Sequence, residues 1–527
     1  MKQLLFRFSS FVGLVLLVFA VTSAHAELRL ASLFQDHMVL QRDMPVPVWG
    51  SADAGAKVTV ELTPSSAGAT SAISGSGGQL KSTTADANGK WKLELDPLSA
   101  SFHPAALRVT STLKSKVESK TCEDVLVGEV WICSGQSNMQ FGVGGVPEVK
   151  ALIPKARSIR SFAVKRTVAF DEQDYCEGEW IDRYPDSAVA FGFAYNLQVA
   201  ADVPVGIILT AWGSSSLEAW MPRDMVDIVP HFKTMMEEFD ANAEAQNQIK
   251  TALSGPKPWS KSDDVFLRRQ SNILYNAMMH PLAPYACRGL VWYQGERNTQ
   301  SMHGMVKNPW FSRNSGMRIY GDVLKQWMQR YRQQWNRDDF HFLVVMLPGL
   351  GNVLKTSPDV PKDNPAAHSW AWMREVQLQA LELSNVGVAN TIDLGDIKNI
   401  HPKDKLPVGE RLALLAARDT LGQQLVAQGP VVKGVKAGRG SLAISFVHAD
   451  GLKTSDDQAP NGFWLADDSG KWARAEATIE GQSVVLKSSK IKNPLYVRYA
   501  FVGKPNVNLV NGANLPAYPF RTDDFQP

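Results

Sequence analysis

Cysteine, net charge and long apolar runs are all scarce in this chain of 527 residues. The four cysteines, Cys122, Cys133, Cys176 and Cys287, form no Cys-x-x-Cys pair, which argues against a structural zinc site. A formal charge of +3 is small for this length and argues against a nucleic-acid-binding protein. The only strongly apolar run that resembles a membrane span lies at the N-terminus. These shortages indicate a globular protein. If it is exported, all three disulfide pairings of its cysteines stay open.

The N-terminal run belongs to a segment with the features of a secretory signal peptide. Lys2 and Arg7 form a positive stretch, the run from Phe11 to Val21 is apolar, and Ala24-His25-Ala26 is a small-residue cleavage site. The apolar run is short for a membrane anchor. We therefore predict cleavage after Ala26 and a secreted or periplasmic protein without stable membrane insertion.

The pattern of apolar residues divides the rest of the chain into three segments. Residues 27–120 contain short alternating runs separated by Gly, Asp and Asn turns, which predicts an N-terminal β-sandwich domain. Between residues 121 and 427, strand-like runs alternate with helical stretches, which predicts a parallel sheet with helices on both faces. Residues 428–527 are again strand-like and rich in turns, which predicts a C-terminal β-rich domain. A chain of this length is too long for a single core.

The central segment contains five predicted strands and four predicted helices. The strands are 125–134, 203–211, 287–293, 340–347 and 386–393. The helices are 188–200, 319–335, 366–383 and 408–421. In the N-terminal segment, the stretch from Ser65 to Gly78 is rich in Ser, Gly and Ala and is predicted to be a loop.

Ser137 is a candidate nucleophile at the end of the first of these strands. The run Val130-Trp131-Ile132-Cys133-Ser134 stops at Gly135, and ligands bind at the carboxyl edge of such sheets. The motif is not Gly-x-Ser-x-Gly, because Met139 takes the last position, which argues against an α/β-hydrolase elbow. The alternative is that Ser137 only caps a helix or forms a turn. Cys133 lies within the apolar run and is predicted to be a buried wall residue.

His401 is the candidate base. It follows the strand that begins at Val386 and precedes the helix containing Gly409-Glu410-Arg411. It is therefore expected at the same sheet edge as Ser137, where it could take the serine proton. The alternative is an ordinary turn histidine before Pro402.

Two further strand ends carry groups that could stabilise an oxyanion. One strand runs into Gly213, whose N–H can approach a carbonyl because no side chain intervenes. Another is followed by Gln294, Glu296 and Asn298, which supply two amides and a carboxylate. Each glycine could equally be an ordinary turn. Nearby aromatic residues suit a sugar face, although such residues are more often core: Trp212, Trp220, Trp292 and Tyr293.

These motifs carry a resemblance to the sialate O-acetylesterase family of carbohydrate esterases, within the wider SGNH hydrolase group. The most specific matches are Ser134-Gly135-Gln136-Ser137-Asn138-Met139 and Trp292-Tyr293-Gln294-Gly295-Glu296. Others are Gly128-Glu129-Val130-Trp131, Glu218-Ala219-Trp220, Ile400-His401-Pro402 with Lys405, Gly409 to Ala413, Met38 to Asp43 and Leu515 to Arg521. The resemblance spans nearly all of the chain after residue 26. It implies an SGNH-hydrolase-like, flavodoxin-like α/β fold, a three-layer parallel-sheet core with β-rich domains at both ends.

The resemblance also implies roles for individual residues. Ser137 would be the nucleophile, with its own N–H in the oxyanion hole, and His401 the general base. Gly213 would give the second oxyanion donor, and Gln294, or alternatively Asn298, the third. We expect Gln136, Glu296, Arg297 and Trp220 to contact substrate. No metal or cofactor is expected.

Three features depart from the family pattern. Lys398 stands where an aspartate often precedes the histidine by three residues. Asp396 is therefore our candidate for the acid that orients His401. Asp393, Glu296 or a Ser–His dyad helped by a backbone carbonyl are the alternatives. Arg297 stands where a small residue is usual, and a cation there could attract an acidic sugar or partly close the site. The segment from Gln300 to Met317 is longer than the family norm and is predicted to form a lid.

The sequence therefore predicts a secreted serine esterase that removes O-acetyl groups from carbohydrates through a Ser–His(–Asp) acyl-enzyme. One alternative is another SGNH hydrolase, of the lipase or thioesterase type. Another is a carbohydrate-binding protein with a degenerate site. The natural sugar, the acetyl position, the oligomeric state and the role of the β-rich domains do not follow from the sequence.

Overall fold

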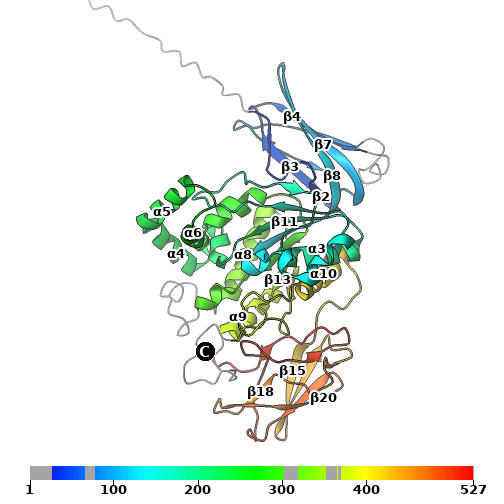
Figure 1. Cartoon of the computed structure of the whole chain (residues 1–527), viewed down its shortest axis with the longest axis vertical. Coiled ribbons are helices and arrows are strands. Elements are labelled where there is room, and N and C mark those ends of the chain that lie inside the picture. Colours follow the sequence, from blue (N-terminus) through cyan, green and yellow to red (C-terminus); the bar gives the residue numbers. More distant parts are fainter. Residues whose placement is uncertain (1–26, 66–77, 302–318, 352–364, 366–368, 526–527) are drawn as a thin grey trace, which may run out of the picture.

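The structure is a computed structural model that describes residues 27–65, 78–301, 319–351, 365 and 369–525. Figure 1 shows a blue β region at the top, an α/β region in the middle and an orange-red β region at the bottom. The predicted signal segment, nearly all of the predicted loop from Ser65 to Gly78 and nearly all of the predicted lid lie outside the described residues. No helix in those ranges is long and apolar enough to cross a membrane.

The N-terminal β region has two groups of strands. β1 (Arg29–Leu30), β3 (Val46–Ser51) and β6 (Lys90–Leu95) form one antiparallel sheet. β4 (Lys57–Pro64) pairs with β5 (Gln79–Thr84) and with β7 (Ser101–Leu113). Alternate residues of β3 and β4 are buried, as expected where one face of each sheet packs on a core.

A single long strand, β8 (Lys116–Gly135), runs from this region into the central sheet. Its first part pairs with β7, and its last part lies between two strands of the central sheet. The predicted boundary between residues 120 and 121 thus falls within one strand. Where β8 enters the core, the buried Glu129 carboxylate accepts hydrogen bonds from Arg42 at 2.7 Å and from Arg288 at 2.8 Å. Together with β2 (Val39–Gln41), which pairs with β8, this contact ties the N-terminal region to the core.

The central sheet has the strand order β10-β9-β11-β8-β12-β13-β14. Its strands besides β8 are β9 (Ile159–Ala163), β10 (Trp180–Ile181), β11 (Val205–Ala211), β12 (Gly289–Tyr293), β13 (His341–Val345) and β14 (Val386–Ala389). Every neighbouring pair is parallel except β9 with β10. The residues of β12 and β13 are all buried, as in a sheet covered on both faces. All five predicted strands are therefore confirmed.

Helices cover both faces of this sheet. Trp131 of β8 packs against Phe193 of α3 (Ala188–Ala201), with ring centroids 5.4 Å apart. Phe342 and Ile132 both pair with Leu290 in the strand register, so their side chains lie on the same face of the sheet. Phe342 packs against Trp327 of α8 (Tyr320–Trp335), with ring centroids 5.7 Å apart. Because neighbouring residues of a strand point to opposite faces, α3 and α8 lie on opposite sides.

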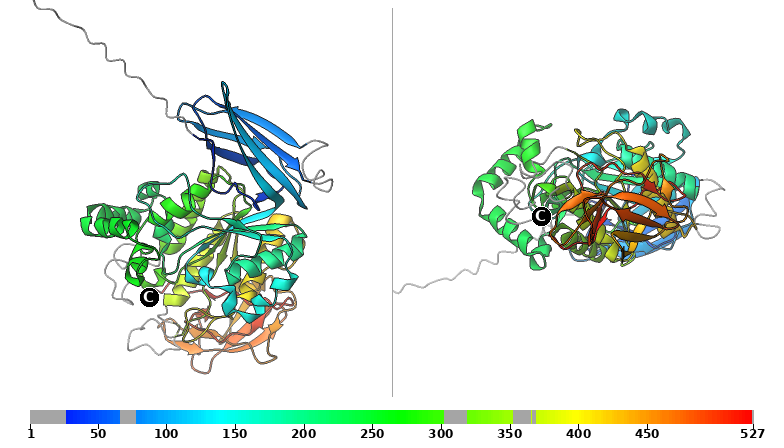
Figure 2. Two further views of the ribbon diagram at one scale, coloured as in Figure 1. Left: turned by 45° about the horizontal axis from the view of Figure 1, so that its top comes forward. Right: turned by 90° about the horizontal axis from the view of Figure 1, so that it is seen from below.

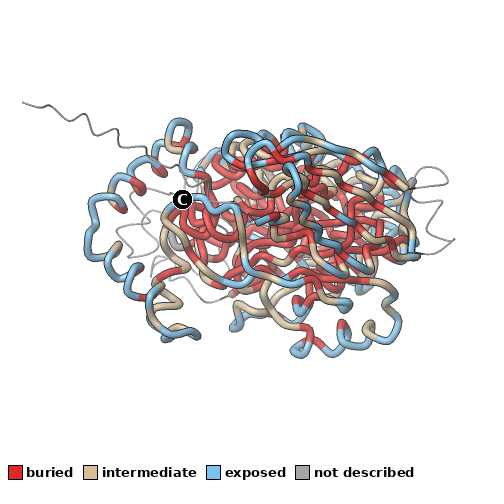
Figure 3. The backbone as a smooth tube through the Cα atoms, turned by 90° about the horizontal axis from the view of Figure 1, so that it is seen from above, coloured by how far each residue is buried: buried red, intermediate tan, exposed pale blue. Residues whose placement is uncertain are grey.

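The remaining helices complete this α/β region. α9 (Ser369–Leu378) packs beside α8, and α10 (Leu406–Leu421) packs against α3, where Gly192 and Gly409 allow close approach. α4 (Pro230–Ala241), α5 (Ala243–Ser254) and α6 (Lys261–Leu267) form a group at one side of the sheet, seen at the left in both Figure 1 and the left view of Figure 2. Figure 3 shows that buried backbone is concentrated in the middle of the molecule.

The C-terminal β region contains two four-stranded antiparallel sheets. One has the order β15 (Val431–Gly438), β16 (Ser441–Val447), β21 (Ser483–Lys487) and β20 (Glu476–Glu480). The other has the order β19 (Trp472–Arg474), β18 (Phe463–Ala466), β22 (Tyr496–Tyr499) and β24 (Phe520–Arg521). A short pair, β17 (Lys453–Thr454) with β23 (Leu509–Val510), accompanies them.

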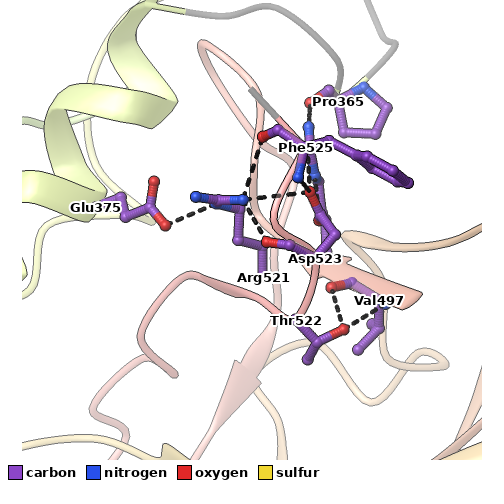
Figure 4. Close-up of polar contacts among 8 residues, drawn as sticks. Pro365, Glu375, Val497, Arg521, Thr522, Asp523 and Phe525 are labelled. Carbon is purple, nitrogen blue, oxygen red and sulfur yellow. Dashed lines mark hydrogen bonds and ion pairs between the residues drawn. The ribbon is translucent and has the colours of Figure 1, made fainter. Parts of the chain in front are cut away.

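An ionic cluster fastens this second β region to α9 (Figure 4). Arg521 contacts Glu375 of α9 at 2.7 Å, and the buried carboxylate of Asp523 pairs with Arg498 at 2.7 Å. The Arg498 guanidinium also lies against the ring of Trp472, 4.6 Å from its centroid. The charges of Arg498 and Asp523 are thus satisfied by each other and by an aromatic face, away from solvent.

All four cysteines lie within the described residues, and none of them is paired in a disulfide. Cys133 is fully buried inside the central sheet, and burial raises the pKa of its thiol. It is therefore a wall residue, as the sequence predicted, rather than a thiolate nucleophile.

Candidate active site

Ser137 lies at the carboxyl end of β8, immediately after a turn that requires glycine. Gly135 has a φ of +136°, and a Cβ on it would lie 2.1 Å from the carbonyl oxygen of Tyr293. The short helix α1 (Ser137–Gln140) begins at the serine, so the Ser137 N–H has no acceptor within that helix. The turn thus presents a hydroxyl and an N–H donor at the same point of the sheet edge.

His401 meets this serine from the loop between β14 and α10. Its Nε2 atom lies 2.8 Å from Oγ of Ser137, although 264 residues separate the two in sequence. Both residues keep some solvent exposure, while Gln136, Asn138 and Met139 around the serine are buried. The distance is that of a serine hydroxyl hydrogen-bonded to its general base.

Two side chains shape the turn that carries His401. Oδ1 of Asp396 accepts hydrogen bonds from the N–H groups of Lys398 at 2.7 Å and Asn399 at 2.9 Å. Oδ1 of Asn399 in turn accepts from the N–H of His401 at 2.9 Å. The carboxylate predicted to orient the imidazole is therefore bound to backbone N–H groups two and three residues later, and acts on His401 only through the turn.

No ion pair or hydrogen bond joins His401 to a carboxylate among the residues that the structure describes. Of the alternative acids, Asp393 pairs with Arg411 at 2.7 Å, and Glu296 binds Asn138. Burial and the positive charge of Lys405 lower the pKa of His401. The imidazole is consequently neutral at neutral pH, the form that can accept the serine proton.

A buried polar cluster lies beneath the Ser–His pair and is centred on Asn138. Nδ2 of Asn138 donates to Oε1 of Glu296 at 2.5 Å and to the carbonyl of Ile400 at 3.0 Å. Its Oδ1 accepts from Nζ of Lys405 at 2.6 Å. Burial raises the pKa of Glu296 to about 7 and lowers that of Lys405 to about 8. Asn138 thus joins the helix of the nucleophile to the loop of the base.

Gly213 reaches the serine from the end of β11. A Cβ on Gly213 would lie 3.2 Å from Cβ of Ser137, so a side chain would crowd the nucleophile. Its N–H donates to Oε1 of Gln140 at 2.9 Å. Gly213 therefore lies beside the nucleophile, with its N–H occupied by a side-chain carbonyl.

Gln294 and Asn298 belong to a buried network that reaches Gln136, because Nε2 of Gln294 donates to Oε1 of Gln136 at 3.2 Å. Nε2 of Gln294 donates to Oδ1 of Asn298 at 2.8 Å and to the carbonyl of Ser215 at 3.1 Å, and its Oε1 accepts from Tyr320 at 2.8 Å. Nδ2 of Asn298 donates to the carboxylate of Glu218 at 3.1 Å. In this conformation the amide protons of both residues are engaged within the core. The structure does not bring them to Ser137 as third oxyanion donors.

The chain is similar to known carbohydrate esterases. The family whose model matches residues 127–255 is described as carbohydrate esterase, sialic acid-specific acetylesterase. The chain is 28% identical to a sialate O-acetylesterase of Mus musculus over 94% of this chain and 93% of the relative, and 25% identical to that of Homo sapiens over 94% and 92%. These similarities support the predicted sialate O-acetylesterase family of carbohydrate esterases. It is accordingly a carboxylic ester hydrolase.

A solved structure supports the same assignment for the fold. The structure, of a carbohydrate acetylesterase from Xanthomonas citri, is 28% identical to this chain. It covers 94% of this chain and 100% of its own, with a TM-score of 0.75. The predicted family and enzyme class are thus confirmed, as is an α/β fold with a mixed sheet and helices.

The predicted substrate-contacting residues of this esterase differ in their placement. Gln136 is buried, and its Oε1 accepts the N–H of Arg297 at 3.1 Å. Trp220 has no exposed surface and donates to Ser215 at 2.9 Å, so it is a core residue in this conformation. Within residues 291–299, Arg297 alone keeps exposed surface. Of the four predicted contacts, it is therefore the only one that is not buried among the described residues.

Three polar residues at the esterase site were missed from the sequence. Asn138 and Gln140 lie inside the matched Ser-Gly-Gln-Ser-Asn-Met segment and directly after it, and Lys405 was noted only as part of the resemblance. One signal could have singled out Lys405: it stands one residue before an apolar helix, where burial of a lysine needs a partner. The partner, Asn138, lies 267 residues away in sequence.

Proposed function

We propose that this esterase removes O-acetyl groups from carbohydrates through a Ser–His acyl-enzyme. The observation that carries the proposal is the 2.8 Å contact between Nε2 of His401 and Oγ of Ser137 at the carboxyl edge of the sheet. Relatives named sialate O-acetylesterase and carbohydrate acetylesterase support the acyl group and the substrate class.

In the acylation step, Oγ of Ser137 attacks the carbonyl carbon of the acetyl ester while Nε2 of His401 takes the hydroxyl proton. The resulting oxyanion is stabilised by the N–H groups of Ser137 and Gly213. Collapse of the tetrahedral intermediate breaks the bond to the sugar oxygen, which receives the proton from His401. An acetyl-serine and a free sugar hydroxyl remain.

Water then completes the cycle by the reverse proton path. His401 removes a proton from the water, whose oxygen attacks the acetyl carbonyl, and the proton returns to Oγ of Ser137 as acetate leaves. In this mechanism His401 is held by its turn and not by a carboxylate. We assign Asp396 the role of a positioning residue, which acts through the N–H groups of Lys398 and Asn399.

We also propose the finer features of the fold and location. The parallel strands β9-β11-β8-β12-β13-β14 with helices on both faces, and a nucleophile directly after β8, are the features expected of an SGNH-type three-layer core. β-rich domains at 27–120 and 428–527 would flank it. The N-terminal segment supports export to the periplasm or the medium, which N-terminal sequencing of the mature protein tests.

Acetate release from p-nitrophenyl acetate and from a panel of O-acetylated sugars tests the mechanism. Ser137→Ala and His401→Ala are each expected to lower kcat by roughly 10³-fold or more, because the two groups act as a unit. Ser489→Ala, an exposed serine of the C-terminal region, is the matched control and should leave kcat unchanged. Full activity of Ser137→Ala would exclude it as the nucleophile.

One observation favours a second function, a carbohydrate-binding protein with a degenerate site. No described carboxylate contacts His401, as expected if the acid of an ancestral triad has been lost. That function requires the wild-type protein to bind acetylated glycans with no release of acetate from any member of the panel.

A further inference from the structure

A cavity opens at the junction between the N-terminal β region and the α/β region. Its volume is about 440 Å³, within the range of sites that hold a small ligand. Strands β3 and β6 contribute one side of its wall, and Tyr175 and Pro284 contribute the other. Pro284 precedes the amino end of β12, whereas Ser137 follows the carboxyl end of the parallel strand β8. The cavity therefore lies at the opposite edge of the central sheet from the proposed active site.

Trp49 of β3 borders this cavity with a half-buried indole ring. Val48 and Gly50 are buried on one face of β3, so Trp49 and Ser51, which are half-buried, share the other face. The indole N–H of Trp49 has no acceptor among the residues that the structure describes. Trp49 thus offers both an aromatic surface and an available donor to a ligand.

Tyr175 forms a second aromatic wall and is fixed in place. Its hydroxyl lies 3.3 Å from Oγ of Ser51, and the guanidinium of Arg29 lies over its ring, 3.4 Å from the centroid. Arg29 does not belong to the cavity wall, so the opposite face of the ring is the one that can meet a ligand. Because Ser51 and Trp49 share a face of β3, the two rings border the same space.

The charged residues of the wall balance one another. They are Asp86, Lys90, Lys92 and Asp174, and all four are exposed. The carboxylate of Asp174 pairs with Nζ of Lys90 at 2.5 Å, and Oδ1 of Asp86 accepts the backbone N–H of Lys90 at 2.9 Å. Two carboxylates and two ammonium groups leave the wall without a net formal charge. The wall thus presents hydrogen-bond donors and acceptors without favouring an ion of either sign.

This combination suits a neutral sugar ring. The C–H groups of a pyranose form apolar faces that pack on aromatic rings, and its hydroxyl groups both donate and accept hydrogen bonds. A wholly apolar ligand would remove the carboxylates and ammonium groups from water without replacing their hydrogen bonds. An ionised ligand would gain little from a wall with balanced charges.

We propose that Trp49, Tyr175, Asp174 and Lys90 form a second, non-catalytic site that binds a neutral pyranose unit of a glycan chain. The sugar ring packs between the two aromatic side chains, and its hydroxyl groups bond to the carboxylate and the ammonium group. Bound in this way, a glycan keeps its acetyl groups at high local concentration near the enzyme. This benefit to catalysis rests on the proposed function, whereas the binding itself does not.

Calorimetric titration of the full chain with neutral oligosaccharides tests the site. The probes are the unacetylated β-1,4-linked hexasaccharides of xylose, glucose, mannose and galactose. At least one of them is expected to bind with a Kd on the order of 0.1 mM. The probe that binds identifies the sugar, and its affinity should not change with added salt because the ligand is uncharged.

Variants assign the binding to the cavity. Trp49→Ala is expected to weaken it by about 10-fold, which corresponds to about 1.4 kcal/mol, and Asp174→Ala by about 5-fold. Trp464→Ala, which replaces a half-buried tryptophan of the C-terminal region, is the matched control and should keep the affinity. Trp49 packs on Phe34 with ring centroids 5.0 Å apart, so Trp49→Ala can affect folding. Asp174 is exposed, and Asp174→Ala therefore tests the site without disturbing the core.

Absence of binding by all four hexasaccharides at concentrations up to about 5 mM would overturn the site. Unchanged affinity in both Trp49→Ala and Asp174→Ala would also overturn it, because the sugar would then bind elsewhere.

Esterase rates separate these results from failure of the proposed function. Trp49→Ala should keep kcat and KM for p-nitrophenyl acetate but raise KM for an acetylated polymer of the sugar that binds. Ester hydrolysis without binding of any hexasaccharide removes the second site alone. Binding without hydrolysis of any ester removes the esterase mechanism and leaves the second site.

Discussion

The side-chain carbonyl of Gln140 occupies the N–H group of Gly213, with 2.9 Å between oxygen and nitrogen. This N–H lies beside the nucleophile, since a Cβ on Gly213 would lie 3.2 Å from Cβ of Ser137. Gln140 thus places an amide oxygen on the donor that the oxyanion needs. For Gly213 to serve the reaction, the Gln140 side chain has to turn away and give its place to the acetyl carbonyl.

Gln140→Ala is therefore expected to favour substrate binding. Loss of a hydrogen bond with a net value of about 1 kcal/mol should lower KM for p-nitrophenyl acetate by about 5-fold, with kcat within about 2-fold of the wild type. Gln140→Glu is the opposing variant, because a carboxylate accepts the Gly213 N–H more strongly and should raise KM. A fall of kcat by about 10-fold or more in Gln140→Ala would instead mean that the amide stabilises the transition state.

Replacement of Asp396 distinguishes a turn residue from the acid of a triad. Its carboxylate binds the N–H groups of Lys398 and Asn399, so Asp396→Ala should misplace His401 and lower kcat by about 10-fold, with little change in KM. Loss of a true triad acid costs about 10⁴-fold. Asp468→Ala, an exposed aspartate of the C-terminal region, is the control. A fall of kcat by about 10⁴-fold in Asp396→Ala would show that the Asp396 carboxylate reaches the imidazole during the reaction.

The sequence was sufficient to predict the elements that carry the Ser–His pair. Long apolar runs such as Val130 to Ser134 identify buried parallel strands directly, and all five predicted strands of the central sheet are present. β9 was missed because Arg160 and Ser161 interrupt its apolar pattern. Arg160 is nevertheless buried, since it pairs with Asp124 at 2.6 Å, and such pairing over 36 residues cannot be read from local periodicity.

The candidate site was less predictable, because its details depend on contacts between distant segments. Gln294 carries the right amide at the right strand end, but Tyr320 and Asn298 hold it within the core. Trp220 looked suited to a sugar, but Trp292 and Trp327 belong to the same aromatic core. Residue type and position restrict the candidates, whereas the direction of each side chain is decided by tertiary packing.

The pH dependence of catalysis should reflect the buried position of His401. Burial and then the charge of Lys405 lower its pKa, so the acidic limb of kcat/KM should lie below the ordinary histidine value of 6.5. Lys405→Met removes the positive charge and should move that limb to higher pH, as measured by kcat/KM between pH 4 and pH 8. Lys403→Met, in the same loop but exposed, is the matched control. If the acidic limb of the kcat/KM profile stays at the same pH in Lys405→Met, the charge of Lys405 does not lower the pKa of His401.

Glu296 should make the protein less stable as pH rises. Burial raises its pKa from 4.5 to about 7, so the folded state holds this proton more tightly than the unfolded state. Stability is therefore lost between about pH 4.5 and pH 7, by an amount on the order of 3 kcal/mol. The stability of Glu296→Gln relative to the wild type should therefore increase as pH rises, as measured by the midpoints of urea unfolding at pH 5 and pH 8. Glu410→Gln is the exposed control, and a gain independent of pH would contradict the assignment.

Asp523 should have the opposite pH dependence. Burial raises its pKa, but the hydrogen bonds and charges of Arg498 and Arg521 outweigh this and hold it below its ordinary value. Asp523→Asn leaves the buried guanidinium of Arg498 without its carboxylate, while Arg521 keeps Glu375, and the cost should be about 3–5 kcal/mol near neutral pH. Because a depressed carboxyl pKa stabilises the fold only above the unfolded value, the difference from wild type should shrink as pH falls below about 4. This difference in stability can be measured by thermal unfolding at pH 7 and pH 3.5. Asp468→Asn is the exposed control. A cost that stays constant with pH would mean that packing, and not the charge, sets the contribution of Asp523 to stability.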